Sequence, residues 1–339
     1  MKKILFSLNC IVLIVISLSL SAQSNYKIVN KISLPGDGFW DYISVDEANG
    51  KIYASHSAIV QVVDIKTGKL VGEIPDTKGV HGIAIAPELN KGFTSNGRDS
   101  SVTVFNLTTL EVVKKIRITG QNPDAILYDS FLKRVFTGNG RSASFSVIDA
   151  VNDKEIGTIP LDGKPEAIVT DGKGKIFVNI EDKSLINVVD ANTLKVISHW
   201  PISPGEEPSG LALDNQTRRL FSVCGNKLMV VIDAETGKVI TTLPIGEGCD
   251  GAAFDPFYKR TYSSNGEGTM TIVQEENPNS FKVIETISTQ RSARTIALDK
   301  TTHHVYLPCA EFESAPSENN RRPAIKPNSF TVLDIETLK

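Results

Sequence analysis

Seven polar residues occupy the same position in successive copies of a repeated sequence phrase, and most of them can bind ions or move protons. They are Asp41, His81, Asp124, Glu166, Ser209, Asp250 and Arg294. Carboxylates held close together repel one another, which raises the pKa of some of them or favours a bound cation. The set therefore predicts a polar site if the fold brings these positions together.

Five of these residues suit a divalent cation, because carboxylate oxygens bind hard ions and an imidazole nitrogen admits a transition metal. They are Asp41, His81, Asp124, Glu166 and Asp250. In an enzyme, His81 or Glu166 would serve as the acid or base. No spacing motif such as His-x-x-x-His supports a metal site, however. A ring of polar residues that lines a water-filled channel and pairs with Arg294 is an equally good interpretation.

A second set of side chains follows the second strand of each repeat. It comprises His56, Asn96, Asn139, Asn179, Cys224, Asn265 and Cys309, with Glu181, Arg98 and Arg141 in the loops just beyond. We expect a second ring around the same site, in which His56, Glu181 and the four asparagines contact a ligand. In the alternative, the asparagines satisfy backbone amides at strand ends.

The elements that position both sets are the strands of a repeat about forty residues long. Its clearest marker is the turn phrase Asp-x-x-Thr at 64–67, 190–193, 233–236 and 334–337, with altered copies at 106–109 and 149–152. Successive markers up to Asp233 are 42, 43, 41 and 43 residues apart. Such a period, filled with β-rich runs, is typical of β-propellers.

Each repeat contains four β-rich runs joined by short turns, which predicts one antiparallel meander. In the second repeat the runs are 82–85, 91–94, 101–105 and 111–118. In a meander the start of the first strand and the end of the second lie on one face. The residues just before each innermost strand and those that end each second strand should therefore surround one central mouth.

The ends of the chain predict how the ring closes. Seven innermost strands are expected to start near Tyr42, Gly82, Ala125, Ala167, Gly210, Gly251 and Thr295. The last repeat lacks an outer strand, and residues 27–35 have the pattern of the outer strand at 238–244. Pairing the N-terminal strand into the last blade would remove an exposed edge. We therefore predict an all-β fold over 23–339, a seven-bladed β-propeller of four-stranded antiparallel blades.

The repeats resemble the YVTN-type β-propeller repeat family, which includes YncE-like secreted propellers. Phe93-Thr94-Ser95-Asn96 and Phe136-Thr137-Gly138-Asn139 stand where that family has Tyr-Val-Thr-Asn, and 233–236 stands at its third-strand exit. The resemblance covers essentially all of 23–339. It implies the fold, but these propellers serve as binding scaffolds, surface proteins and occasionally enzymes, so it does not imply one activity.

Two features would shape the mouth. Phe39 and Trp40 precede Asp41 and would form an apolar wall, although packing between blades is as good an account of Trp40. The last repeat carries an insertion at 310–327 that leaves the second strand on the face of the mouth. We expect this insertion to lie over or beside the mouth or to be a solvated loop.

Residues 1–22 have the pattern of a signal peptide: two lysines, an apolar run and small residues ending at Ala22. A lipoprotein anchored at Cys10 fits this segment less well, and a retained membrane helix is the other alternative. We expect an extracytoplasmic protein with no stable membrane span in the mature chain. Its Cys224 and Cys249 would lie at equivalent ends of adjacent strands, which permits a disulfide, while simple burial is the alternative.

Removing 1–22 leaves 34 basic and 39 acidic residues, so the charge does not favour nucleic acid as a partner. We therefore expect a monomeric, exported binding scaffold whose Asp/Glu/His-rich mouth binds a small molecule, a cation or a protein partner. A divalent cation is the cofactor that the residues allow. The alternative is a metal-assisted lyase or hydrolase, resembling the streptogramin lyases and lactonases built on related propellers, that uses the same mouth.

Overall fold

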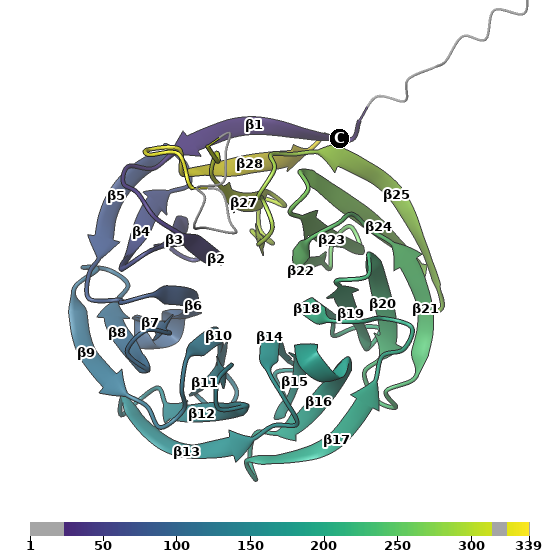
Figure 1. Ribbon diagram of the computed structural model, residues 1–339, viewed down its shortest axis with the longest axis horizontal. Coiled ribbons are helices and arrows are strands. Elements are labelled where there is room, and N and C mark those ends of the chain that lie inside the picture. Colours follow the sequence, from purple (N-terminus) through teal and green to yellow (C-terminus); the bar gives the residue numbers. More distant parts are fainter. Residues whose placement is uncertain (1–23, 314–323, 339) are drawn as a thin grey trace, which may run out of the picture.

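Seven four-stranded sheets surround a central axis in the computed structural model, which describes residues 24–313 and 324–338 (Figure 1). Every pair of neighbouring strands within a sheet is antiparallel, as in the pairing of β3 with β4. The predicted seven-bladed β-propeller is therefore confirmed. The signal peptide expected at 1–22 lies outside the described residues, as do residues 314–323 of the insertion.

In the first six blades the strands run from the axis outward in chain order. The first four blades contain β2 (Trp40–Asp46), β3 (Lys51–His56), β4 (Ile59–Asp64) and β5 (Lys69–Ile74); β6 (Val80–Ala86), β7 (Lys91–Asn96), β8 (Ser101–Asn106) and β9 (Val112–Arg117); β10 (Pro123–Asp129), β11 (Arg134–Asn139), β12 (Ser144–Asp149) and β13 (Lys154–Pro160); and β14 (Pro165–Thr170), β15 (Lys175–Ile180), β16 (Leu185–Asp190) and β17 (Lys195–Pro201).

The remaining blades complete the ring. They contain β18 (Pro208–Asp214), β19 (Arg219–Cys224), β20 (Leu228–Asp233) and β21 (Val239–Pro244); β22 (Cys249–Asp255), β23 (Arg260–Asn265), β24 (Thr269–Asn277) and β25 (Ser280–Ser288); and β26 (Ala297–Leu298), β27 (Val305–Cys309), β28 (Thr331–Thr337) and β1 (Tyr26–Ser33). The short 3-10 helices are η1 (Pro87–Leu89) and η2 (Glu181–Lys183). Within the described part of the chain, no helix is long and apolar enough to cross a membrane.

The repeated turn phrase has a local role. The Asp64 carboxylate accepts hydrogen bonds from the backbone N–H of Thr67 at 2.8 Å and from its hydroxyl at 2.7 Å. Asp233 and Thr236 repeat this arrangement. An aspartate that binds the backbone ahead of it fixes a tight turn, so the phrase marks the connection between the third and fourth strands.

The ring closes as predicted. Strand β1 pairs with β28 from Tyr26 opposite Thr337 to Ser33 opposite Thr331, and Figure 1 shows the two strands side by side at the outer edge of the last blade. Ile32 of β1 is 4% exposed. It belongs to an apolar cluster that also includes Trp40 of the first blade and Phe330 of the last. The closure therefore joins the two ends of the chain through backbone pairing and buried apolar contact.

The innermost strands begin earlier than the sequence predicts. β2, β6, β10, β14, β18 and β22 start two residues before the expected positions, whereas β26 starts later. Each of the six early strands has an irregular register just after its first residue, such as that between Trp40 and Ile43. A bulge breaks the period-two alternation on which strand starts are predicted, which explains the difference.

Candidate functional site

The bulges position most of the seven polar residues predicted to surround the mouth, which we call the inner ring. Asp41, His81 and Asp124 are each the second residue of an innermost strand, as are Glu166, Ser209 and Asp250, whereas Arg294 precedes β26. A bulged residue is released from regular cross-strand pairing and can be re-aimed. Asp41, Asp124, Glu166, Asp250 and Arg294 line one cavity of 650 Å³ at the axis.

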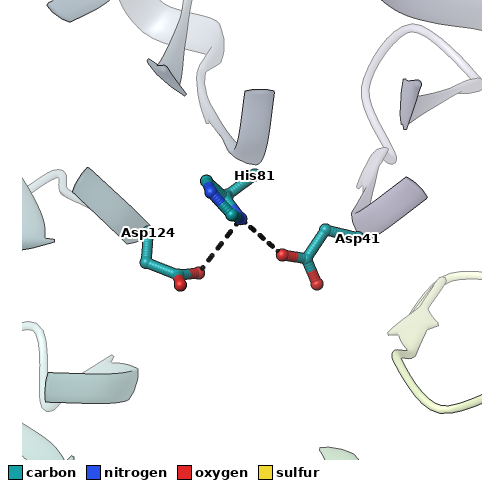
Figure 2. Close-up of side chains that lie close together, drawn as sticks. All are labelled: Asp41, His81 and Asp124. Atoms are coloured by element: carbon teal, nitrogen blue, oxygen red, sulfur yellow. Dashed lines mark hydrogen bonds and ion pairs between the residues drawn. The ribbon is translucent and has the colours of Figure 1, made fainter. Parts of the chain in front are cut away.

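The structure brings three of these side chains into one cluster. His81 Nδ1 lies 2.7 Å from Asp41 Oδ2 and 3.6 Å from Asp124 Oδ1, and Figure 2 shows both carboxylates pointing toward the imidazole. One ligand atom from each residue falls within 4.8 Å of the other two. An imidazole nitrogen with two carboxylate oxygens is a donor set that suits a divalent transition metal.

The two other carboxylates proposed as metal ligands have cationic partners. Arg294 forms an ion pair with Asp250, and its second nitrogen lies 3.2 Å from Asp41 Oδ1. Lys164 Nζ lies 2.7 Å from Glu166 Oε1 and also pairs with Glu181. Asp124 is thus the inner-ring carboxylate with the weakest charge compensation, since its ion-pair contact is the longer one to His81.

Burial and crowding perturb the pKa values of these groups. Burial raises the pKa of Asp124 to about 6, with the charge of Asp41 adding to the effect and that of His81 opposing it. Burial, followed by the charge of Asp124, raises the pKa of Glu166 to about 7 against the opposing Lys164. Burial alone would lower the pKa of His81, but the hydrogen bond to Asp41 and the charge of Asp124 raise it overall. These are the shifts expected of clustered acids.

Lys164 and Tyr42 are site residues that sequence reasoning missed. Lys164 stands two residues before Glu166, in the loop that leads into β14. Tyr42 directly follows Asp41 and lines the same cavity. Burial and the charges of Asp124, Glu166 and Asp41 raise its pKa well above the ordinary value, so its phenol remains protonated. A comparison of the residues flanking each ring position would have found both.

One side of the mouth is apolar. Phe39 is 60% exposed and lines the cavity, as do Trp40 and Phe312. Trp40 is buried, its ring lies 6.3 Å from that of Phe312, and its Nε1–H donates to the carbonyl of Pro308. Trp40 therefore borders the cavity and also packs between the first and last blades. Phe312 belongs to the inserted segment, where a bridge to Ile325 forms a short stem at the rim of the mouth.

The second ring lies mostly inside the blades. Asn96, Asn139 and Asn265 are completely buried, and each is hydrogen-bonded to hydroxyl groups of its own blade. Asn179 donates to the carbonyls of Ser209 and Gly210. These asparagines are placed to support the strand ends rather than to contact a ligand. Ser209 is also turned away from the mouth, because its hydroxyl donates to the carbonyl of Cys249.

His56 and the cysteines are buried as well. His56 is 2% exposed, with Nδ1 3.0 Å from Gln61 Oε1 and its ring 4.5 Å from that of Phe330. Cys224, Cys249 and Cys309 are free thiols, and Cys249 Sγ donates to the carbonyl of Cys224 at 3.1 Å. Of the second set, Glu181 reaches the mouth, while Arg98 and Arg141 line a different pocket on the same face.

The buried asparagines give a prediction about stability. Replacing Asn139 by alanine leaves Thr137, Ser144 and Ser146 without their shared partner, which we expect to lower the free energy of unfolding by about 1–3 kcal/mol. Urea unfolding followed by circular dichroism measures the change. Asn192→Ala, at an exposed turn, is the control and should stay within about 0.5 kcal/mol of wild type. Equal effects of the two substitutions would contradict the supporting role of Asn139.

Comparison with known proteins adds information on the fold alone. No family model matches the chain, and no curated protein matches it. Many solved structures are similar. Among them are Kuenenia stuttgartiensis hydrazine synthase, with a TM-score of 0.72, 16% identity and coverage of 88% of this chain and 96% of that one, and a chain of a mitotic checkpoint complex, with a TM-score of 0.75, 11% identity and coverage of 100% and 99%. At these identities the similarity supports the propeller architecture and carries no activity.

Proposed function

We propose that this protein is an exported binding propeller whose central mouth binds a small, positively charged ligand. The observation that supports it most is the concentration of acids around one cavity. Asp41, Asp124, Glu166, Glu181 and Asp250 line a volume of 650 Å³. A bound positive charge would stabilise the ionised carboxylates of Asp124 and Glu166, which burial and neighbouring acids destabilise.

Size and polarity are consistent with a small ligand. The cavity volume falls in the range usual for small-molecule sites. Phe39 and Phe312 offer an apolar side, while the cluster around Asp124 offers charge. A ligand with an ammonium group and an apolar body would contact both. The phenol of Tyr42 would supply a neutral hydrogen-bond donor, because its pKa lies well above the ordinary value.

Calorimetric titration at about pH 8 tests the proposal with four separate probes: Mn²⁺, Ca²⁺, Zn²⁺ and 1,4-diaminobutane. We expect at least one probe to bind stoichiometrically, because Asp124 and Glu166, with pKa values raised to about 6 and about 7, are mostly ionised at this pH and attract a cation. Asp124→Asn should weaken that binding by at least about tenfold, or about 1.4 kcal/mol. Glu206→Gln, which removes an exposed acid outside the cavity lining, should leave it unchanged.

Two outcomes would contradict a cation-binding mouth. One is that none of the four probes binds to the wild-type protein. The other is that Asp124→Asn binds as tightly as wild type, which would place the ligand elsewhere. Binding of the diamine without any metal would favour an organic ligand.

A second candidate function rests on the cluster of Asp41, His81 and Asp124. Their ligand atoms lie within 4.8 Å of one another beside the cavity, so these residues would hold a divalent metal ion. Such an ion would act as a Lewis acid, and the protein would be a metal-assisted hydrolase or lyase. Binding of Mn²⁺ or Zn²⁺ in preference to the diamine, lost in Asp124→Asn, would favour this alternative.

The proposed location and family follow from the sequence. The signal pattern at 1–22 supports export from the cytoplasm, and the repeat phrases support membership of the YVTN-type repeat family. Export would expose the mouth to extracytoplasmic solutes. Detection of the mature N-terminus after cell fractionation tests the location.

A further inference from the structure

Three arginines converge on a second pocket on the same face of the propeller. Arg98 lies in the β7–β8 turn, Arg117 ends β9, and Arg141 lies in the β11–β12 turn. All three are exposed and line one pocket of 400 Å³ between the second and third blades. The residues lining this pocket are distinct from those lining the central mouth.

The residues that line this pocket carry a net positive charge, with three arginines against Asp99. Over residues 24–313 and 324–338, none of the three guanidinium groups forms an ion pair. Asp99 also lines the pocket, but Lys115 lies 2.9 Å from its carboxylate and the Ser101 hydroxyl donates to it. The nearby Glu155 carboxylate accepts hydrogen bonds from the backbone N–H and the hydroxyl of Thr119. An anion entering the pocket would relieve the mutual repulsion of the arginines.

The arginines are departures from the repeat rather than requirements of the fold. Arg117 stands opposite Ser101, the first residue of a third strand. In three other blades this position holds proline, namely Pro160, Pro201 and Pro244. The phrase Asn-Gly-Arg occurs at the second-strand exit of only two blades, the two that border this pocket. Residues that break a structural pattern without a structural need are candidates for function.

We propose that this arginine pocket binds a phosphate group, either as inorganic phosphate or as the phosphate monoester of a small molecule. Guanidinium groups present paired N–H donors that match two phosphate oxygens at once. The hydroxyl of Ser100 and the side-chain amide of Gln121 also line the pocket and add further donors. The site is independent of the central mouth.

Calorimetric titration in phosphate-free buffer at fixed ionic strength tests this site with two probes, inorganic phosphate and glycerol 3-phosphate. Fixed ionic strength is needed because salt screens exposed charges. We expect wild type to bind at least one probe stoichiometrically. The triple variant Arg98→Gln, Arg117→Gln, Arg141→Gln should bind at least about tenfold more weakly, which corresponds to about 1.4 kcal/mol. Tighter binding of glycerol 3-phosphate would identify a monoester, and tighter binding of inorganic phosphate would identify the free ion.

The control variant carries Lys66→Gln, Lys173→Gln and Lys195→Gln. It removes the same charge from exposed positions at or beside the turns of the opposite face and should bind as wild type does. If the triple arginine variant fails to fold, Arg117→Pro replaces it, because proline occupies this position in other blades, and it should weaken binding severalfold. Absence of binding to wild type, or equal binding by wild type and these arginine variants, would overturn the proposal. Asp124→Asn should leave phosphate binding intact, so failure at the mouth and failure here are distinguishable.

Discussion

Replacing Ile32 by aspartate is expected to lower the free energy of unfolding by about 4 kcal/mol or more, because it places an unpaired charge in an apolar interior. Ile32 is 4% exposed on the strand that closes the ring, opposite Val332. Its cluster includes Trp40 of the first blade and Phe330 of the last. Loss of this contact separates the first blade from the last, so we expect the whole ring to open.

Val29→Asp is the matched control, since Val29 lies on the same strand but is 41% exposed. It should change the free energy of unfolding by no more than about 0.5 kcal/mol. Urea unfolding followed by circular dichroism and by tryptophan fluorescence compares the two variants. If both variants unfold at the urea concentration of wild type, closure by β1 does not hold the ring together. If both are equally destabilised, strand pairing matters more than the buried contact of Ile32.

The blade count and the closure were predictable because local signals repeat with the fold. Asp64 and Asp233 bind the turn ahead of them within four residues, so each copy of the phrase reports one blade without knowledge of the others. The N-terminal strand was recognisable because an outer strand has the same alternation wherever it occurs in the chain. Both predictions depend only on short-range sequence patterns, which can be recognised without the tertiary structure.

The pairing of the ring residues was not predictable in the same way. Periodicity places Asp41, Glu166 and Asp250 around one axis. Which cation forms an ion pair with which acid, Arg294 with Asp250 and Lys164 with Glu166, depends on side-chain length and on the bulges. Of the five residues predicted as metal ligands, Asp41, His81 and Asp124 therefore lie together. Glu166 and Asp250 form ion pairs with Lys164 and Arg294 instead.

The burial of the second ring had a signal in the sequence. Asn96 is preceded at two residues by Thr94 and followed by Ser101 and Thr103, and these hydroxyls are its hydrogen-bond partners. Asn139 has hydroxyl residues at the same offsets. A buried asparagine needs several partners, so hydroxyls repeated around it indicate support of the strand end rather than ligand contact.

The ligand-free protein is expected to lose stability as pH rises from about 5 to about 8. Asp124 and Glu166 have pKa values raised to about 6 and about 7 in the folded state. Above the ordinary carboxyl pKa near 4, the unfolded chain has released protons that the folded protein still holds, so the free energy of unfolding falls as pH rises through this window. The raised pKa of His81 acts in the same direction, because its charged form stabilises the fold at low pH.

Thermal unfolding of wild type and of the double variant Asp124→Asn, Glu166→Gln measures the effect. We expect wild type to lose on the order of 3 kcal/mol over this range, after discounting for the coupling of the two acids. The double variant should have a flatter profile and should be more stable than wild type at about pH 8. Turn aspartates such as Asp64 have lowered pKa values, so their contribution is lost only at lower pH. His56 and His304 titrate alike in both proteins and cancel in the comparison.

The same pair of proteins links stability to ligand binding. A cation that binds the ionised mouth should raise the unfolding temperature of wild type more at about pH 8 than at about pH 5, because protons compete with it at the lower pH. The double variant should show little of this stabilisation at either pH. If the stability of the two ligand-free proteins changes equally with pH, ionisation of Asp124 and Glu166 costs the folded state little free energy. Neutralising these carboxylates would then contribute little to the free energy of cation binding, which would contradict the proposed function of the mouth.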